Sequence, residues 1–265
     1  MAEYDYDLVV IGSGPAGQKA AVQAGKLGKR VAIVERMQVV GGVAINTGTI
    51  PSKALREAIL HLTGFRHRSI YGESYKVKQD ITIEDIISWC QVVVKGGVDV
   101  TEAQLLRNSV DIHHGEGRFK DAHTVEVHHG GETKEFTTEH ALISTGTRPA
   151  RPENIPFDRT HVVDADGILT IPKLPKSLIV VGGGVIGTEY ASMMSALGVR
   201  VTLIEGRDRL LNFLDAEIGE ALQYHLRQTG MTLRLGEKVT SVEKREAPPT
   251  MKSDDGVVVE AVLES

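Results

Sequence analysis

The same glycine-rich pattern occurs twice in this chain, each time after a short apolar run. The first copy is VVIGSGPAG at residues 9–17, and the second is IVVGGGVIG at residues 179–187. One G-x-G-x-x-G alone is a weak signal, because a pattern with three fixed positions turns up by chance. Two copies, each between an apolar strand and a helix-like stretch, predict two βαβ units that each bind a dinucleotide. The alternative is a pair of ordinary strand-turn-helix units without a ligand.

Both copies predict the same succession of strand, helix and strand. In the first copy these elements are residues 7–11, 15–27 and 31–34, with Glu35 at the end. In the second copy they are residues 178–181, 185–197 and 199–204, with Glu205 at the end. Each carboxylate lies about 20 residues beyond its loop, at the distance where such a side chain accepts hydrogen bonds from ribose hydroxyls. The predicted fold class is therefore α/β, with two doubly wound, Rossmann-like dinucleotide-binding domains.

The three glycines of each loop have separate tasks. Gly12 permits the tight turn, Gly14 lets the backbone approach a pyrophosphate, and Gly17 lets the helix lie close to the sheet. The anion then lies at a helix N-terminus, where N–H groups and the helix dipole favour negative charge. The second loop repeats these tasks with Gly182, Gly184 and Gly187.

Composition limits the partners and the location. A net charge of -5 over 265 residues disfavours nucleic acid as a partner. No apolar run reaches the roughly 18 residues that span a bilayer, and the N-terminal MAEYDYD is acidic where a signal peptide is basic. We therefore expect no membrane partner and a cytoplasmic location. The single cysteine, Cys90, excludes an internal disulfide, and its apolar neighbours indicate a packed thiol rather than a nucleophile.

Patterning predicts several further elements between and after the loops. They are a loop at 37–47, a helix at 49–63, a mostly helical stretch at 82–108 with a weak point at Gly96-Gly97, a strand at 110–114, a hairpin of 125–127 with 134–137, a strand at 141–144 and a last strand at 257–263. Prolines between residues 149 and 175 predict a linker. The predicted domains are therefore residues 1–150 and 151–265.

The most specific stretch between the loops is GGVAINTGTIPSKALREA at residues 41–58. It resembles the flavoprotein disulfide reductases, the relatives of lipoamide dehydrogenase and glutathione reductase, whose matching segment has two cysteines before Ile-Pro-Ser-Lys. Here Ala44 and Thr49 stand at the cysteine positions. Within that superfamily, GTIPSKALREA is similar to the soluble pyridine nucleotide transhydrogenases. The resemblance continues through GEGRF, STGTRPARP, GVIGTEYAS and RDRLLNFLD.

The resemblance implies FAD as the cofactor of residues 1–150 and NAD or NADP as that of residues 151–265. A disulfide reductase passes electrons from reduced flavin through paired sulfurs, and neither alanine nor threonine can accept them. The implied reaction is then a ping-pong hydride transfer, in which NADPH reduces FAD and NAD takes the hydride. The alternatives are a flavin-dependent NAD(P)H oxidase or diaphorase, and a catalytically silent nucleotide-binding module.

The resemblance also implies the site residues. Lys53 and Glu189 would form an ion pair beside the reactive edge of the flavin, where a positive group stabilises the anionic reduced ring; the alternative is a solvated lysine and glutamate. The implied FAD contacts are Gly12, Gly14, Pro15, Ala16, Gly17, Glu35, Arg36, Gly41, Gly42, Val43, Ala44, Gly48, Thr49, Lys53, Glu116, Gly117, Thr145 and Gly146. The implied NAD(P) contacts are Gly182, Gly184, Val185, Ile186, Gly187, Glu205 and Arg207.

Glu205 and Arg207 bear on the choice between NAD and NADP. A carboxylate at the end of that strand suits the free 2′-hydroxyl of NAD, whereas a nearby arginine suits the 2′-phosphate of NADP. The presence of both fits an enzyme that binds the two nucleotides in turn. An NAD-preferring enzyme with arginines at its surface is the alternative.

Two further expectations concern metal and assembly. The histidine pairs at 113–114 and 128–129 lie on strand ends and a turn and lack the combination of carboxylates and cysteines of a metal site, so we expect no metal there. The resemblance implies a later strand, a Gly-Asp motif and a C-terminal dimerisation domain that are not among the 265 residues. We therefore expect an N-terminal portion of a protein that is a homo-oligomer at full length.

Overall fold

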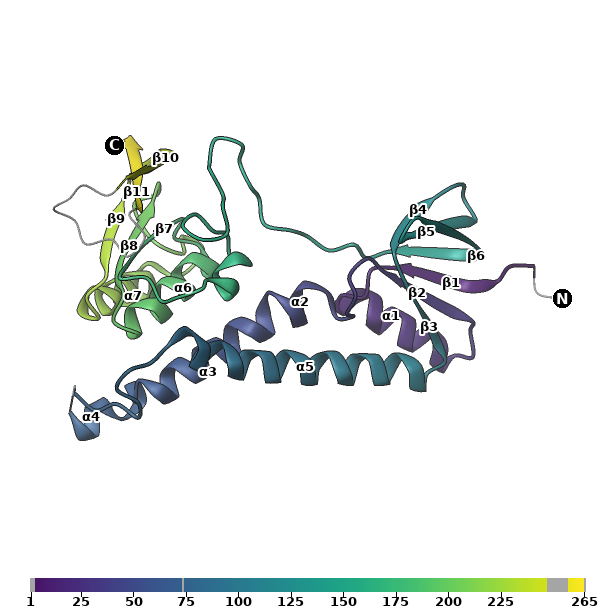
Figure 1. Ribbon diagram of the computed structural model, residues 1–265, viewed down its shortest axis with the longest axis horizontal. Helices are drawn as coiled ribbons and strands as arrows, with labels where there is room; N and C mark the ends of the chain where they lie inside the picture. The colour runs from purple at the N-terminus through teal and green to yellow at the C-terminus, as the bar shows by residue number, and fades with distance from the viewer. Residues whose placement is uncertain (1–2, 73, 247–256, 265) are drawn as a thin grey trace. The chain divides into compact units, whose positions relative to one another are not determined.

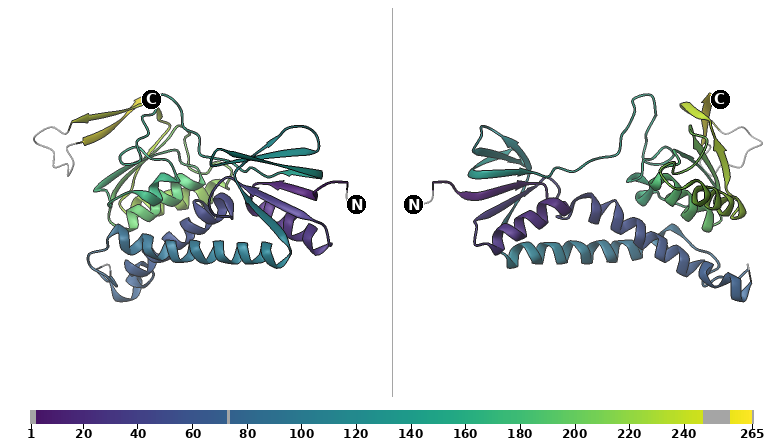
Figure 2. Two further views of the ribbon diagram at one scale, coloured as in Figure 1. Left: turned by 45° about the vertical axis from the view of Figure 1, so that its right-hand side comes forward. Right: turned by 180° about the vertical axis from the view of Figure 1, so that it is seen from behind.

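The computed structural model describes residues 3–72, 74–246 and 257–264. The chain divides into two compact units, whose elements Figure 1 and Figure 2 show from three directions. The first unit contains Met1–Ala54 and Cys90–Arg148, and the second contains Leu55–Trp89 and Pro149–Ser265. Each unit holds one of the two glycine loops.

The first unit is built on a six-stranded sheet in the order β3-β2-β1-β6-β5-β4 (Figure 1). β1 pairs in parallel with β2 and β6, and β2 pairs in parallel with β3, while β4, β5 and β6 form an antiparallel meander. With α1 (Pro15–Lys26) between β1 and β2, this arrangement confirms the first predicted βαβ unit. The strands are β1 (Tyr6–Ile11), β2 (Val31–Glu35), β3 (Val110–His114), β4 (Glu116–Phe119), β5 (Thr124–His129) and β6 (Glu132–Ile143).

β6 replaces two predicted strands with one. The predictions at 134–137 and 141–144 were wrong in leaving a gap, since β6 runs without a break through residues 138–140. Thr137 pairs with Thr124 of β5, and the next residue, Thr138, pairs with Tyr6 of β1. Residues 138–140 include no glycine or proline that would end a strand, and Thr138 is fully buried. The hairpin therefore continues directly into the parallel part of the sheet.

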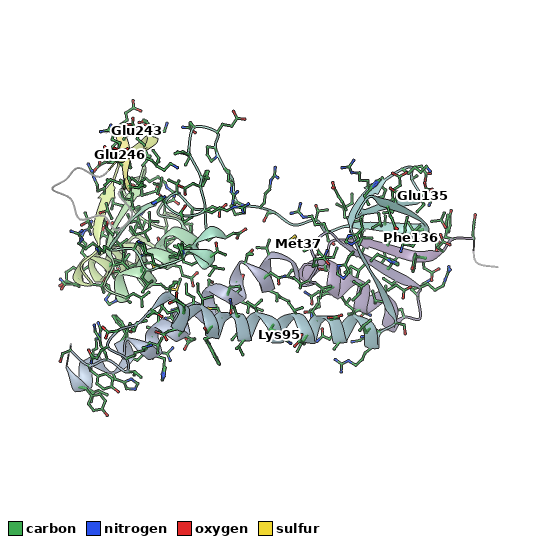
Figure 3. The ribbon with its side chains drawn as sticks, viewed as in Figure 1. Met37, Lys95, Glu135, Phe136, Glu243 and Glu246 are labelled. Carbon is green, nitrogen blue, oxygen red and sulfur yellow. The ribbon has the colours of Figure 1, made fainter. Side chains whose placement is uncertain are left out.

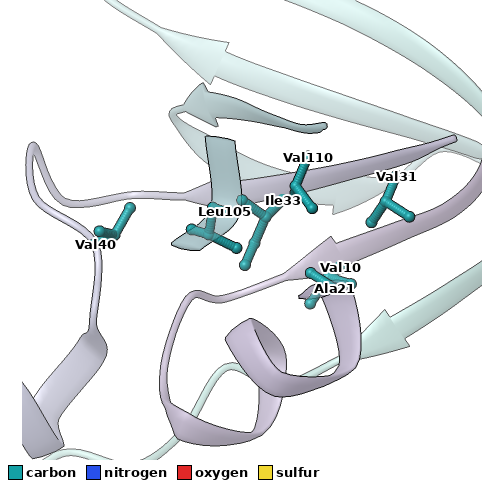
Figure 4. Close-up of a cluster of buried hydrophobic side chains, with 7 residues drawn as sticks. All are labelled: Val10, Ala21, Val31, Ile33, Val40, Leu105 and Val110. Carbon is teal, nitrogen blue, oxygen red and sulfur yellow. The ribbon is translucent and has the colours of Figure 1, made fainter. Parts of the chain in front are cut away.

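Apolar side chains cover both faces of the central strands. On one face, residues of β1, β2 and β3 pack with α1 and with α5 (Ile83–Arg107). This cluster contains Val10, Ala21, Val31, Ile33, Val40, Leu105 and Val110 (Figure 4). On the other face, Val9, Ile11, Ala32 and Val34 pack against Val125 and Val127 of the meander. Burial on both faces explains why residues 8–11 of β1 and 31–34 of β2 are continuously apolar rather than alternating.

α5 is continuous from Ile83 to Arg107, so the predicted weak point at Gly96-Gly97 does not interrupt it. Two interior glycines cost a helix roughly 2 kcal/mol relative to alanine. Burial of Ile86, Cys90 and Leu105 along one face offsets that cost. Before α5 come α3 (Thr49–Leu62), which confirms the helix expected at 49–63, a 3-10 turn at Phe65–His67 and α4 (Arg68–Tyr71).

The second unit repeats the βαβ arrangement. Its parallel sheet has the order β7-β8-β9, and the antiparallel pair β10 and β11 follows. The last strand confirms the one expected at 257–263. The elements are a 3-10 turn at Gly167–Thr170, β7 (Ser177–Val181), α6 (Val185–Ala196), β8 (Arg200–Glu205), α7 (Ala216–Gln228), β9 (Thr232–Leu235), β10 (Lys238–Glu246) and β11 (Val257–Glu264).

Cys90 is a packed thiol, as the sequence indicated. Its side chain is buried, and its Sγ lies 3.8 Å from the carbonyl oxygen of Pro51. Burial raises the pKa of the Cys90 thiol to about 11, so the reactive thiolate is scarce at neutral pH.

Candidate nucleotide-binding sites

The first glycine loop joins β1 to α1 through a tight turn. Gly12 has a φ of +103°, a conformation that side chains rarely adopt, and its N–H donates to the carbonyl oxygen of Val34 at 2.8 Å. A Cβ on Gly17 would overlap the carbonyl oxygen of Gly12. The two glycines thus close the turn and allow α1 to lie against the sheet.

Gly14 leaves open space at the start of α1. It is the N-cap residue, its backbone is extended, and no described side chain caps the helix. Apart from chain neighbours and its own helix, no described atom lies within 4 Å of the place a Cβ on Gly14 would take. The first turn begins with Pro15 and contains no acidic residue. The N–H groups of this turn therefore face a position that suits an anion.

Ser13 connects the loop to Glu35, a role that the glycine motif does not predict. The Ser13 side chain is fully buried, and both its N–H and its Oγ–H donate to Oε2 of Glu35. Ser13 Oγ accepts from the N–H of Gly41 at 2.9 Å, and Glu35 Oε1 accepts from the N–H of Met37 at 3.0 Å. Ser13 occupies a variable position of the glycine motif. Its polar contacts with two distant segments are therefore not visible in the motif itself.

The Gly41-Gly42 turn packs directly on the glycine loop. A Cβ on Gly42 would lie 2.7 Å from the Cα of Gly14. The turn leads into α2 (Gly42–Asn46), where the sequence predicted only a loop at 37–47. Asn46 Nδ2 donates to the carbonyl oxygens of Val40 and Gly42 at 3.1 and 3.0 Å. These side-chain bonds stabilise a helix of five residues that is too short for periodicity to reveal.

Two more segments gather at the same carboxyl edge of the sheet. The N–H of Gly115 donates to the carbonyl oxygen of Glu35 at 2.8 Å, and a Cβ on Gly117 would lie 3.2 Å from the Ile11 side chain. Ser144 Oγ donates to the carbonyl oxygen of Gly12 at 2.9 Å. The structure thus brings together four segments predicted as FAD contacts, namely 12–17, 41–42, 116–117 and 145–146.

The second glycine loop repeats the first in detail. Gly182 also has a φ of +103°, and a Cβ on Gly187 would overlap the carbonyl oxygen of Gly182. Gly184 is the N-cap of α6, with no side-chain cap and no described atom within 4 Å of a Cβ position. The first turn of α6 exposes two apolar side chains, Val185 and Ile186.

Glu205 ends β8, and all four acceptor positions of its carboxylate are occupied. Oε1 accepts from the N–H and the Nε–H of Arg207 at 3.0 and 2.9 Å. Oε2 accepts from the N–H of Gly183 at 2.7 Å and from Nη2 of Arg207 at 2.9 Å. Nη1 of Arg207 donates to Oδ1 of Asn212 at 2.9 Å. In this conformation Glu205 has no lone pair left for a ribose hydroxyl.

The arginine also sets the charge state of this carboxylate. Side-chain hydrogen bonds from Arg207 lower the pKa of Glu205 to about 2, and the same contact raises the pKa of Arg207. Glu205 is buried, whereas the Arg207 side chain is 48% exposed. In the first unit, the carboxylate of Glu35 accepts from Ser13 and Met37 among the described residues, and no cation takes the place of Arg207.

Lys53 and Glu189 lie in different units. Lys53 is exposed at the fifth position of α3, and its Nζ lies 3.5 Å from Oγ of Ser52. Glu189 is in α6, where its backbone carbonyl accepts from Oγ of Ser192 at 2.7 Å. The ion pair between Lys53 and Glu189 stays a prediction.

The remaining predicted contacts lie near the first loop or on its neighbouring helices. Ala44 is in α2 and Thr49 is the first residue of α3. The N–H of Gly48 donates to the carbonyl oxygen of Val43 at 2.7 Å and closes the corner between the two helices. Exposed positions include Arg36, Val43, Glu116, Thr145 and Gly146.

The histidines of the two pairs make packing and hydrogen-bond contacts. His113 stacks on Phe136 with ring centroids 4.3 Å apart, and its Nε2 lies 3.0 Å from the hydroxyl of Tyr6. His128 Nδ1 lies 2.9 Å from Oγ1 of Thr133. Across the described ranges, no cluster of three or more His, Cys, Asp or Glu residues has the arrangement of a metal site. Nor does any helix in those ranges combine the length and apolar character needed to cross a membrane.

Comparison with curated proteins gives relatives over almost the whole chain. Proteins named soluble pyridine nucleotide transhydrogenase from Mycobacterium tuberculosis and Mycobacterium bovis are 51% identical over 265 residues, which covers 98% of this chain and 57% of theirs. A protein of the same name from Colwellia psychrerythraea is 41% identical over 97% of this chain and 53% of its own length. The chain thus spans little more than half the length of these relatives.

Solved structures and a family model agree with these relatives. The HOCl-induced flavoprotein disulfide reductase from Escherichia coli is 27% identical, with a TM-score of 0.78 over 98% of this chain and 54% of that one. Its Cu(II) complex gives a TM-score of 0.76 at 26% identity over 96% of this chain. The model of the pyridine nucleotide-disulphide oxidoreductases matches residues 6–263. With two glycine loops of matching geometry inside that range, the chain belongs to the pyridine nucleotide-disulphide oxidoreductase family.

Proposed function

We propose that this chain is the nucleotide-binding part of a flavin-dependent transhydrogenase, with FAD in the first unit and NAD or NADP in the second. Membership of the family implies FAD with NAD(P) as cofactors. The observation that carries the proposal is the pair of open, uncapped glycine loops in a chain whose only cysteine is buried in α5. The two loops account for two nucleotides, and a single buried cysteine cannot form the dithiol that would carry electrons to another substrate.

The first unit fits the diphosphate and ribose of FAD. The space beside Gly14 admits a pyrophosphate that a side chain there would exclude. Glu35 lies at the end of β2 with one acceptor position on Oε1 not taken by a described donor, which suits a ribose hydroxyl. FAD, when bound, supplies a carrier that accepts a hydride from one nicotinamide and returns it to another.

The cysteine content favours transhydrogenation over disulfide reduction. A disulfide reductase needs two thiols that exchange electrons with the flavin and with the substrate. Ala44 and Thr49 stand at the positions where the resemblance expects those thiols, and Cys90 is buried with a raised pKa. Electrons that arrive from a nicotinamide then leave by a second nicotinamide, without a protein disulfide.

The second unit fits both nicotinamide dinucleotides through one pair of side chains. Glu205 suits the 2′-hydroxyl of NAD, but its acceptor positions become available only when Arg207 moves away. Arg207, once released, brings a guanidinium that suits the 2′-phosphate of NADP. While Arg207 is hydrogen-bonded to Glu205, its positive charge neutralises the carboxylate. Glu205 therefore repels a 2′-phosphate less than an unpaired carboxylate would.

Lys53 of the first unit and Glu189 of the second are the residues to which we assign catalytic roles. Lys53 is the fifth residue of α3, near the N-terminal end, where the helix dipole does not favour a cation. Lys53 would stabilise negative charge on the reduced ring of bound FAD, and Glu189 is the fifth residue of α6, one turn beyond the second glycine loop.

Flavin retention and hydride transfer test the proposal. The chain is incubated with FAD, desalted and examined by visible absorbance, and transfer from NADPH to a thio-analogue of NAD is then followed together with oxygen consumption. Retained flavin with transfer and no oxygen consumption is the expected result. Oxygen consumption instead of transfer indicates an oxidase. Failure to retain flavin indicates a binding module without redox function.

A further inference from the structure

The side chain of Arg207 is held by two residues, and only one of them is Glu205. Its Nε and Nη2 donate to the two carboxylate oxygens of Glu205, at 2.9 Å each. Its Nη1 donates to Oδ1 of Asn212, also at 2.9 Å. We call this the closed arrangement of Arg207. Asn212 is exposed and is not among the nucleotide contacts that the sequence implies, so its hydrogen bond needs a separate explanation.

The turn that carries Asn212 is fixed on the second glycine loop. Leu210 is fully buried, and a Cβ on Gly183 would overlap its side chain. The N–H of Leu211 donates to the carbonyl oxygen of Gly183 at 3.2 Å. Leu211 also has a φ of +47°, a left-handed conformation that residues with a Cβ rarely adopt. Because these contacts hold the backbone next to Asn212, its carboxamide is placed at a defined position beside the loop.

The backbone of Arg207 is also held in place, so a change at this residue is a movement of its side chain. Its N–H donates to Oε1 of Glu205 at 3.0 Å, and its carbonyl oxygen accepts from the N–H of Gly236 at 2.8 Å. The side chain is 48% exposed. Rotation of the side chain into solvent breaks its three hydrogen bonds and frees two acceptor positions on Glu205, while the backbone donors stay bonded.

The first unit has neither an arginine nor an asparagine at the matching positions. Met37, labelled in Figure 3, stands two residues after Glu35, and its side chain has no hydrogen-bond donor. Gly42 stands seven residues after Glu35 and has no side chain. The residues at the same distances from the strand-end glutamate of the second unit are Arg207 and Asn212. The arrangement therefore belongs to the unit for which we propose an exchangeable nucleotide.

The closed arrangement affects the two nicotinamide dinucleotides differently. NADH needs the acceptor positions on Glu205, so it binds only those molecules in which Arg207 has moved away. A guanidinium has five N–H groups, and the structure gives three of those of Arg207 an acceptor among the described residues. The other two N–H groups suit a 2′-phosphate without displacement of Arg207. The closed arrangement thus weakens the binding of NADH more than that of NADPH.

We propose that Asn212 is a positioning residue for nucleotide specificity. By holding Arg207 on Glu205, it lowers the affinity of the second unit for NADH relative to NADPH. The inference rests on the proposed function, in which the second unit binds both nucleotides. One hydrogen bond between exposed side chains changes such an equilibrium by about two- to tenfold. Loss of the Asn212 acceptor should therefore strengthen the binding of NADH by a factor of this size.

Asn212→Leu keeps the size of the side chain and removes the acceptor. Titration with NADH and with NADPH, followed by nicotinamide fluorescence, measures both affinities. We expect NADH to bind about two- to tenfold more tightly than to the unsubstituted chain, and NADPH to bind with little change. Asn154→Leu is the matched control, because Asn154 is an exposed asparagine of the same unit that bonds to the carbonyl oxygen of Thr240. An unchanged NADH affinity in Asn212→Leu, or an equal gain for NADPH, overturns the proposal.

A double substitution shows whether Asn212 acts through Arg207. In a chain that carries Arg207→Ala, there is no guanidinium for Asn212 to hold, so Asn212→Leu should no longer change the affinity for NADH. An effect of equal size with and without Arg207 would mean that Asn212 contacts the nucleotide itself, which contradicts the proposal. Circular dichroism shows whether all the variants are folded.

A measurement without nucleotide distinguishes failure of this inference from failure of the proposed function. Hydrogen exchange of the Arg207 Nε–H, followed by side-chain NMR, reports how often the guanidinium leaves Glu205. Exchange should be about two- to tenfold faster in Asn212→Leu than in the unsubstituted chain. Unchanged exchange in a chain that binds both nucleotides overturns this inference alone. A chain that binds neither nucleotide overturns the proposed function, and this inference with it.

Discussion

Glu205 and Arg207 form a pair in which each residue limits what the other can bind. Arg207→Ala frees two acceptor positions on Glu205 and removes the guanidinium. Affinity for NADH should therefore rise relative to NADPH, and Glu205→Ala should do the reverse, each by about 1–3 kcal/mol for a charged hydrogen bond. Titration of the chain with NADH and NADPH, followed by nicotinamide fluorescence, measures both constants.

Arg209 provides the matched control for this pair. It is an exposed arginine of the same loop and makes no hydrogen bond to Glu205 in the described structure. Arg209→Ala should change the affinities for NADH and NADPH by similar factors, because it removes only a positive charge from the loop. If Arg207→Ala does the same, the side chain does not discriminate at the 2′-position.

Glu205 also makes the stability of the second unit depend on pH. Its pKa is lowered from 4.5 to about 2, so the folded state favours the charged carboxylate. This contribution is fully present above pH 4.5 and is lost as the pH falls from there towards 2. Glu205→Gln should therefore remove part of the acid destabilisation. Urea unfolding of both proteins between pH 2 and 6 measures the difference, and identical pH profiles would contradict the assignment.

Individual residues show how far the sequence could predict the site. The motif glycines and the two strand-end glutamates were predictable, since their spacing follows from the βαβ geometry. Ser13 was not, because its role depends on contacts with Glu35 and Gly41 that only folding creates. The two hydrogen bonds from the Arg207 side chain to Glu205 were not predictable either, because a guanidinium two residues from a carboxylate can turn towards it or towards solvent.

Among the elements, long stretches with strong periodicity predicted the bounds of helices well. Short segments and single glycine pairs predicted them less well. The helices at 15–27 and 49–63 lie within one residue of the observed ends. α2 escaped prediction because five residues carry no period, and its stability comes from Asn46. The glycine pair did not interrupt α5, because tertiary burial of the opposite face outweighs intrinsic propensity.

α7 illustrates an element whose start depends on one side chain. Asp215 is its N-cap, and its Oδ1 accepts from the N–H of Glu217 at 2.9 Å. Asp215→Ala should lower the free energy of unfolding by about 1 kcal/mol, whereas Asp215→Asn should lower it much less. Urea unfolding followed by circular dichroism measures both. Equal losses for the two variants would mean that the cap does not contribute.

At the scale of the whole molecule, the two units repeat one design with different side chains. Gly12 and Gly182 share a φ of +103°, and Gly17 and Gly187 close onto them in the same way. This repetition was visible in the sequence, and it is why two nucleotide sites could be predicted without a structure. The assignment of FAD to one unit and NAD(P) to the other rests on the resemblance and on the segments around each loop.

The most direct test of this assignment uses two matched substitutions, Gly14→Val and Gly184→Val. Both glycines have negative φ, and a Cβ at either position meets no described atom within 4 Å, so both variants should fold. Each new side chain fills the space for one pyrophosphate. Flavin absorbance after desalting and NADPH titration are measured on both variants and the unsubstituted chain.

We expect the two variants to lose different nucleotides. Gly14→Val should lose bound FAD and keep NADPH affinity, while Gly184→Val should keep FAD and lose NADPH affinity. Circular dichroism should show both variants folded. A folded Gly14→Val variant that retains full flavin absorbance would show that the first glycine loop does not hold the flavin.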